Sequence, residues 1–210
     1  YLGVIYNRGQ SSLRHQSDTT LYKNSRRHCT VRMADSLLRL CQDGRLEEVR
    51  AALARGEEVN QRVLGTTGLM MAADNGHEAV VELLLQQPGL DVNLADEENR
   101  QTALHQACIE GHTGIVSALL AHPSLTCQNA VDNDGDSPLM VAANHGHEAV
   151  VELLLKQLGL DVNLTDGQDR RTALHSASIE GHTGIVRMLL AHPSLTCQNA
   201  VDSEGDSPLR

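Results

Sequence analysis

Apolar residues recur along the chain in short stripes with the spacing of a helix face. Leu104, Ala107 and Cys108 stand at positions i, i+3 and i+4, which places them on one side of a helix. Gly111 follows this stripe, and glycine is the residue that most readily adopts the left-handed conformation at a helix end. A second stripe occupies residues 113–121, so the pattern predicts two short helices joined by a tight turn. The inward side of the second helix is expected to hold Ile115, Val116, Leu119 and Leu120.

The signals that flank these helices recur every 35 residues. A threonine or serine stands two residues before a leucine at Thr67, Thr102, Ser137, Thr172 and Ser207. A Gly-His pair begins at Gly76, Gly111, Gly146 and Gly181. A hydroxyl side chain at a helix start accepts a hydrogen bond from a free N–H of the first turn, so the first series predicts N-caps. Residues 102–132 and 172–202 are almost identical, which indicates that the units were copied in pairs.

Helix pairs of this length cannot form a stable domain one by one. Short isolated helices are marginal in water, and each pair leaves its apolar stripes uncovered. Repeated units solve this problem because identical units can stack, each covering the next. The sequence therefore predicts an elongated array of helix–turn–helix units connected by turn-rich segments.

The units resemble the ankyrin repeat, whose signature is T-P-L-H-x-A. The resemblance is carried by Ser137-Pro-Leu-Met-Val-Ala-Ala, Thr102-Ala-Leu-His-Gln-Ala, the Gly-His pairs, Val80-Val-Glu-Leu-Leu-Leu, and the Asp-Val-Asn triplets at Asp91 and Asp161. It covers about residues 34–210 and implies an all-α, ankyrin-type α-solenoid whose units are joined by β-turn fingers. Two features depart from the family pattern: the connecting loops are longer, and Gly68, Ala103 and Ala173 replace the signature proline.

The repeat spacing also predicts the organisation of the whole chain. We expect a basic, disordered leader at 1–33, a divergent N-terminal capping repeat at 34–66, repeats at 67–101, 102–136, 137–171 and 172–206, and the start of a truncated repeat at 207–210. A basic arm or transit-like segment is the alternative for the leader. In the capping repeat, Leu37, Leu38 and Cys41 are expected to form the first stripe. The end of the chain suggests a fragment, and its last complete unit is expected to expose Leu189 and Leu190 or their neighbours.

The composition of the chain argues against several classes of function. Residues 1–32 carry a net charge of +5 and the remainder −15, and there is no Trp, no Phe and no Tyr after Tyr22. An acidic body without aromatic rings lacks both the cations and the stacking platforms used for nucleic acid binding. No apolar run is long enough to span a membrane and no signal peptide is present. We therefore expect a monomeric protein of the cytoplasm, with the nucleus as the alternative.

The histidines and acidic loops do not predict a metal site. Equivalent histidines in adjacent layers would be about 8–10 Å apart, whereas zinc ligands lie at about 2 Å from one ion, so we expect the rings to link turns and repeats by hydrogen bonds. The stretch from Asp132 resembles a calcium loop, but Ser137 and Ala143 stand where that loop needs glycine and glutamate. Catalytic motifs are absent, so the sequence predicts no catalytic residue, cofactor or metal.

The resemblance implies that partner proteins bind a concave face. The contact positions would stand just before each Ser/Thr cap and just before each helix-ending glycine. These are Glu98, Asn99, Gln101, Ile109, Glu110, Asn133, Asp134, Asp136, Asn144, His145, Gln168, Asp169, Arg171, Ile179 and Glu180. The row is acidic and has no Tyr or Trp, so a partner presenting a basic segment with its own large side chains is expected.

Two further expectations follow from the resemblance. Asn93 and Asn163 close a Leu-x5-Asp-Val-Asn pattern like that of ankyrin repeats modified by asparaginyl hydroxylases, the alternative being that they only hold the loop by side-chain hydrogen bonds. For function, we expect a non-catalytic protein-binding scaffold or adaptor. The alternatives are a targeting or regulatory module of a larger enzyme or channel, and an inhibitor that masks a transcription factor.

Overall fold

Helices begin at the caps that the sequence provides. The computed structural model describes residues 36–209 of the chain. The hydroxyl oxygens of Thr67, Thr102 and Ser137 each accept a hydrogen bond from the backbone N–H three residues further on, at 3.3–3.4 Å. Pro138 occupies the first helical position, where its missing N–H costs nothing. The second helix of each pair begins directly after the histidine of a Gly-His pair or, in the first unit, after Arg45.

The elements alternate between short helices and turns. The helices are α2 (Leu37–Gln42), α3 (Leu46–Ala54), α4 (Gly68–Asp74), α5 (Glu78–Leu85), α6 (Ala103–Glu110), α7 (Thr113–Leu120), α8 (Pro138–Asn144), α9 (Glu148–Leu155), α10 (Ala173–Ile179) and α11 (Thr183–Ala191), with a 3-10 turn η1 (Cys127–Asn129). Strands β1 (Arg62–Val63) and β2 (Thr66–Thr67) pair antiparallel.

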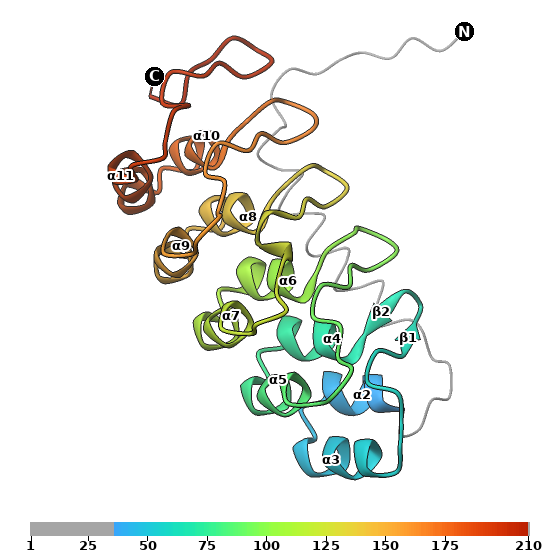
Figure 1. The fold of residues 1–210 in the computed structure, drawn as a ribbon. Coiled ribbons are helices and arrows are strands. Elements are labelled where there is room, and N and C mark those ends of the chain that lie inside the picture. Colours follow the sequence, from blue (N-terminus) through green and yellow to red (C-terminus); the bar gives the residue numbers. More distant parts are fainter. Residues whose placement is uncertain (1–35, 210) are drawn as a thin grey trace, which may run out of the picture. The chain divides into compact units, whose positions relative to one another are not determined.

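The helices form two rows (Figure 1). Helices α2, α4, α6, α8 and α10 pack against one another in order, and α3, α5, α7, α9 and α11 form the second row beside them. Five loops project beyond the first row, and we call them fingers 1 to 5: residues 62–67, 95–102, 131–137, 165–172 and 201–207. The predicted all-α solenoid of stacked helix–turn–helix units is confirmed, and in the first finger the β-turn carries a short strand pair.

Small residues in the first row let the helices approach closely. Ala72, Ala107, Ala142 and Ala177 are fully buried at equivalent positions. Leucine, valine and isoleucine side chains of both rows then form one continuous buried cluster that runs through the stack. Because no large ring is needed to fill a thin two-row stack, the lack of Trp and Phe is compatible with a complete core.

One expectation about individual leucines is wrong, and two others hold only in part. In α2 the buried stripe is Leu37, Leu40 and Cys41, whereas Leu38 is only half-buried, because the helix begins at Leu37 and its inward face continues at i+3 and i+4. Leu120 is half-buried and packs against the edge of the core, so its expected inward position holds in part. In the last helix pair Leu189 is fully buried, since α11 packs on α9 and α10, while Leu190 is 42% exposed as expected.

Part of the predicted organisation lies outside the described residues. This applies to the expected leader at 1–33, to the first two residues of the expected capping repeat and to Arg210. Within residues 36–209, no helix combines the length and the apolar character that crossing a membrane requires.

Candidate functional site

Each of fingers 2 to 5 is closed by one aspartate side chain. In finger 3 the Oδ1 atom of Asp132 accepts hydrogen bonds from the N–H groups of Asp134 (3.0 Å) and Asp136 (2.9 Å). Equivalent bonds are accepted by Asp96, Asp166 and Asp202 in the other three fingers. An aspartate that accepts from the backbone a few residues on fixes a turn, so these carboxylates set the shape of the fingers.

The electrostatics of finger 5 follow from this arrangement. Burial on its own would raise the pKa of Asp202, which is 5% exposed. Hydrogen bonds from the N–H groups of Asp206 and Glu204, together with the guanidinium of Arg171, outweigh burial and hold this pKa below its ordinary value. The finger is therefore held by an ionised carboxylate.

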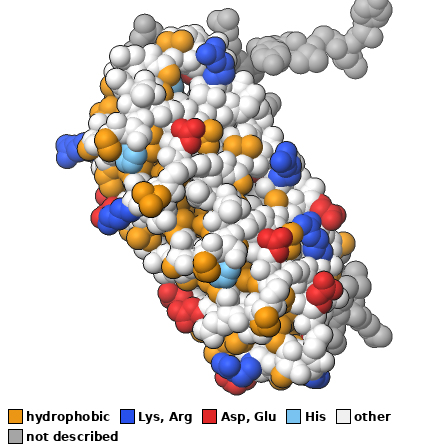
Figure 2. Space-filling model, viewed as in Figure 1, with side chains coloured by type: hydrophobic (Ala, Val, Ile, Leu, Met, Phe, Trp, Pro, Cys, Tyr) orange, Lys and Arg blue, Asp and Glu red, His pale blue; other side chains and the backbone are white. Residues whose placement is uncertain are grey.

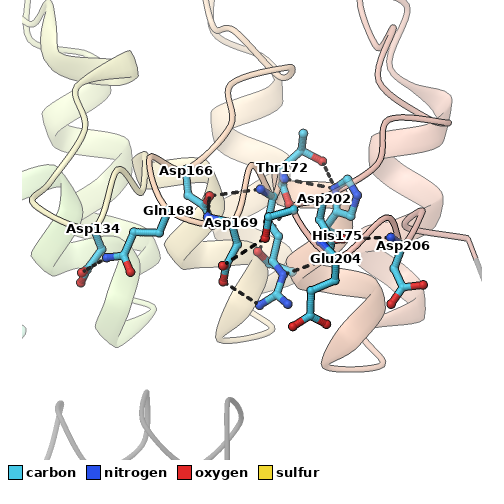
Figure 3. Close-up of polar contacts among 12 residues, drawn as sticks. Asp134, Asp166, Gln168, Asp169, Thr172, His175, Asp202, Glu204 and Asp206 are labelled. Carbon is cyan, nitrogen blue, oxygen red and sulfur yellow. Dashed lines mark hydrogen bonds and ion pairs between the residues drawn. The ribbon is translucent and has the colours of Figure 1, made fainter. Parts of the chain in front are cut away.

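Neighbouring fingers are joined through polar contacts (Figure 3). The Nε2 atom of Gln168 in finger 4 donates to Oδ1 of Asp134 in finger 3 at 2.9 Å. The N–H of Ser203 in finger 5 donates to the carbonyl of Asp169 at 2.7 Å. Asn133 makes the corresponding link to finger 2, through its N–H to Asn99 O (2.9 Å) and its Nδ2 to Glu98 O (2.7 Å). The fingers thus form a connected row.

Arg171 is part of this connection. Its Nε lies 3.4 Å from Oδ2 of Asp202 and its Nη1 lies 3.3 Å from Oδ2 of Asp169. Because the guanidinium is committed to these two carboxylates and its side chain is only 22% exposed, the structure assigns Arg171 a role between fingers 4 and 5. In finger 2, Gln101 has a comparable position, donating from Nε2 to Asp132 of finger 3 at 3.2 Å.

Two buried histidines contact the helix caps, and one of them also bonds to the next finger. Nδ1 of His105 accepts the N–H of Thr102 at 3.2 Å, while its Nε2 donates to the carbonyl of Asp136 in the next finger at 3.2 Å. Burial lowers the pKa of His105, which keeps the ring neutral as these bonds require. His175 makes the same contact with Thr172, but its buried Nε2 has no partner among the described residues.

The histidines of the Gly-His pairs tie each helix pair to the preceding one. Nε2 of His77, His112, His147 and His182 lies 2.9–3.3 Å from a backbone carbonyl of the preceding unit. Each ring packs on the preceding helix-ending glycine, and a Cβ at Gly111 would lie 2.6 Å from Nδ1 of His147. The prediction that these imidazoles connect neighbouring repeats is confirmed.

Asparagine side chains form a third set of links at the opposite loops. Oδ1 of Asn93 accepts the N–H groups of Thr126 (2.7 Å) and Cys127 (3.1 Å), and its Nδ2 donates to Ser124 O (2.7 Å). Asn163 makes the same bonds one repeat pair later. Asn60 and Asn129, which the sequence pattern did not identify, also bridge to the next loop. Hydroxylation of Asn93 and Asn163 stays a prediction.

The predicted contact row divides by exposure. The exposed members are Glu98, Asn133, Asp134, His145, Gln168, Ile179 and Glu180. The half-buried members are Asn99, Gln101, Ile109, Glu110, Asp136, Asn144, Asp169 and Arg171. The first group reaches the surface, although Asn133, Asp134 and Gln168 of this group also take part in the bonds between fingers. Asn99, Asp169 and Arg171 of the second group hold the finger row together.

Sequence reasoning missed the closing aspartates, and one signal could have found them. An aspartate stands five or six residues before the cap in fingers 2 to 5, at Asp96, Asp132, Asp166 and Asp202. Asp132 is 6% exposed and faces the backbone of its own finger, whereas Asp134 two residues later is exposed.

The remaining candidate chemistry is structural. Among residues 36–209, no three or more His, Cys, Asp or Glu side chains are grouped so that they could hold a metal ion. The four described cysteines are free thiols. Burial raises the pKa of Cys41 to about 12 and also raises that of Cys108, so both thiols stay protonated and unreactive near neutral pH.

Most of the chain matches known protein-family models. A family model described as ankyrin repeats in three copies matches residues 21–96 and 89–166, and a model described as ankyrin repeat matches residues 169–202. A search of curated proteins finds no significant match.

Proposed function

The chain belongs to the ankyrin repeat family, and we propose that it is a non-catalytic scaffold that binds a partner protein along its fingers and first helices. Ankyrin repeats are generally protein–protein interaction modules without catalytic activity. The proposal concerns which face is used and what chemistry the partner brings.

The observation that carries the proposal is a row of exposed side chains on a rigid support. Glu98, Asp134 and Gln168 lie on three consecutive fingers that are joined by backbone and side-chain hydrogen bonds. Ile179 is 57% exposed at the C-terminal end of the first helix α10. A surface held in place before binding loses little entropy when a partner docks, which favours affinity.

The negative net charge of the repeat region favours a partner whose binding segment is basic. Residues 33–210 carry a net charge of −15, and the exposed members of the contact row are acidic or neutral. Figure 2 shows acidic and basic side chains interspersed on the face in view rather than one continuous acidic patch. The partner should therefore be attracted by its basic residues and positioned by individual charge pairs.

The compartment proposed is the cytoplasm or nucleus. Free, mostly buried cysteines are typical of proteins in a reducing environment.

The test compares two faces of the same molecule. In the variant E98K/D134K, two exposed finger carboxylates become cationic. In the matched control E82K/E152K, two exposed carboxylates of the second helices α5 and α9 are reversed, which gives the same change in net charge. Immobilised wild type and both variants are used to capture proteins, which are then identified and quantified by mass spectrometry.

We expect specific partners to be retained by the wild type and by E82K/E152K but lost by E98K/D134K. The affinity of a captured partner for the wild type should also decrease as salt increases, because the charge pairs are exposed. If both variants lost the captured partners equally, the change in net charge alone would explain the loss, and the proposed binding face would be contradicted.

A further inference from the structure

One position of every finger has left-handed backbone, and two of the five fingers place an arginine there. The position stands two residues before the Ser/Thr cap and is occupied in turn by Gly65, Arg100, Gly135, Arg170 and Gly205. The φ angles are 78°, 58°, 87°, 58° and 85°. The finger fold therefore accepts glycine at this place and requires a positive φ of whichever residue is present.

Arginine is an unfavourable choice for this backbone. Left-handed conformations are disfavoured for residues with a Cβ, whereas glycine adopts them freely. The three glycine fingers show that the fold has a strain-free alternative at this position. Strained residues of this kind cluster at binding and catalytic sites, where the side chain supplies something that the fold itself does not need.

Nothing in the described part of the chain uses these two guanidinium groups. Arg100 and Arg170 are both exposed, and neither forms an ion pair or a side-chain hydrogen bond within residues 36–209. The neighbouring Arg171 differs, since it is bonded to two carboxylates. Arg100 and Arg170 are thus cations without internal carboxylate partners, set in a strongly acidic body.

The support beneath each arginine is rigid. The residue before Arg100 accepts through its carbonyl the N–H of Asn133, and the residue before Arg170 accepts the N–H of Ser203, at 2.9 and 2.7 Å. Each arginine therefore projects from a turn that is fixed to the next finger. The two fingers are separated by one intervening finger, so the arginines are about 16–20 Å apart if each layer adds about 8–10 Å.

We propose that Arg100 and Arg170 form a two-point clamp for carboxylates of the partner segment. This proposal rests on the proposed function and refines it. A bidentate guanidinium–carboxylate pair suits an exposed arginine, and the net charge of the body disfavours a polyanion such as nucleic acid. The exposed Asp134 lies on the finger between the two arginines, so a lysine or arginine of the partner would meet it.

The spacing specifies the partner further. An extended chain advances about 3.3 Å per residue, so six residues cover about 20 Å. Side chains of an extended chain alternate between two faces, so the three charged residues must be separated by even numbers of residues to meet the same surface. The segment that fits is an extended peptide of the pattern Glu-x-Lys-x-x-x-Glu, with a cation between two carboxylates.

The test uses the full chain and two synthetic peptides of equal composition. One peptide has the Glu-x-Lys-x-x-x-Glu pattern, and the other has both glutamates adjacent. Binding is followed by fluorescence anisotropy and by the NMR signals of the arginine side-chain N–H groups. We expect the patterned peptide to bind about three- to tenfold more tightly and to shift the signals of Arg100 and Arg170 but not that of Arg171.

Variants separate recognition from structure. R100G/R170G installs the residue of the other fingers, so it should bind both peptides equally and unfold at the same or a slightly higher temperature. R100E/R170E should instead prefer a peptide with lysine at all three positions. Equal binding of the two glutamate peptides to the wild type, absence of any binding at millimolar peptide, or a lower unfolding temperature of R100G/R170G would overturn the clamp.

Failure of the clamp would leave the proposed function separately testable. Loss of captured proteins from E98K/D134K with retention by R100G/R170G would mean that a partner uses the finger row without the two arginines. Retention of the same partners by both variants would contradict the proposed face itself.

Discussion

Nε2 of His105 donates to the backbone carbonyl of Asp136 across 3.2 Å, and this contact joins the capping box of one repeat to the finger that leads into the next. The same ring accepts the N–H of Thr102 at Nδ1. Both bonds require one protonated and one unprotonated nitrogen, so the junction needs a neutral imidazole.

This junction should make stability depend on pH. Burial lowers the pKa of His105, although the carboxylates of Asp132 and Asp96 and the carbonyl of Asp136 act in the opposite direction. The unfolded chain then takes up a proton at this ring at higher pH than the folded protein does. The free energy of unfolding should therefore decrease as the pH falls below about 6.5.

The measurement is urea unfolding between pH 7.5 and 5 for the wild type and for the variant His105→Met. Methionine is chosen because it occupies the equivalent position in two other repeats, at Met70 and Met140. The variant should lose part of the dependence on pH. Met140→Leu changes the same position in another repeat without a titrating group, and its curve should run parallel to that of the wild type. An unchanged slope in His105→Met would show that other groups cause the pH dependence.

Packing of a histidine ring on the preceding glycine should be measurable by a matched pair of substitutions. Gly111 and Gly181 have nearly the same φ, 73° and 77°, so alanine strains both backbones by a similar amount. A Cβ at Gly111 would also meet the ring of His147, whereas nothing lies within 4 Å at Gly181. We expect Gly181→Ala to cost about 1 kcal/mol and Gly111→Ala about 1–2 kcal/mol more in urea unfolding. Equal costs would mean that the ring moves aside freely.

The closing aspartates should matter far more than the exposed acidic residues beside them. Asp132→Ala leaves the N–H groups of Asp134 and Asp136 without their acceptor, so we expect a loss of about 2–3 kcal/mol in the free energy of unfolding. Asp134→Ala removes an exposed carboxylate together with its solvent-exposed bond from Gln168, and should change the free energy of unfolding by about 0.5 kcal/mol or less. Thermal or urea unfolding of the two variants decides this, and similar losses would contradict the structural role of Asp132.

Asparagine hydroxylation can be tested within the chain itself. Asn93 and Asn163 follow the Asp-Val dipeptide, whereas Asn60 and Asn129 make comparable bridging bonds after Glu-Val and Cys-Gln. Treatment with an asparaginyl hydroxylase and its co-substrates should add one oxygen to Asn93 and Asn163 only, as located by peptide mass spectrometry. An unmodified protein, or modification of all four residues, would contradict the sequence-specific prediction.

Local rules explain why so much of the fold could be predicted. The cap at Thr102, the helix end at Gly111 and the stripe beginning at Leu104 each depend on residues within one turn or two. Their repetition at 35 residues then implies stacking, since the short helices have no other way to bury their apolar faces. Helix pairs, their order and the all-α class therefore follow from the sequence.

The candidate site could be predicted from the sequence only in part, because its side chains are positioned by hydrogen-bond partners about 31–38 residues away in the chain. Asp132 and Asp134 are the same residue type two positions apart, yet the finger backbone buries the first and exposes the second. Arg170 and Arg171 are adjacent, yet only Arg171 reaches the carboxylate of Asp202 in the next finger. The sequence by itself determined the repeat and its stacking, because those depend on contacts within a unit and on its apolar stripes. The tertiary structure alone decided which polar side chains hold the fingers together and which remain for a partner, because that depends on how successive fingers lie against each other.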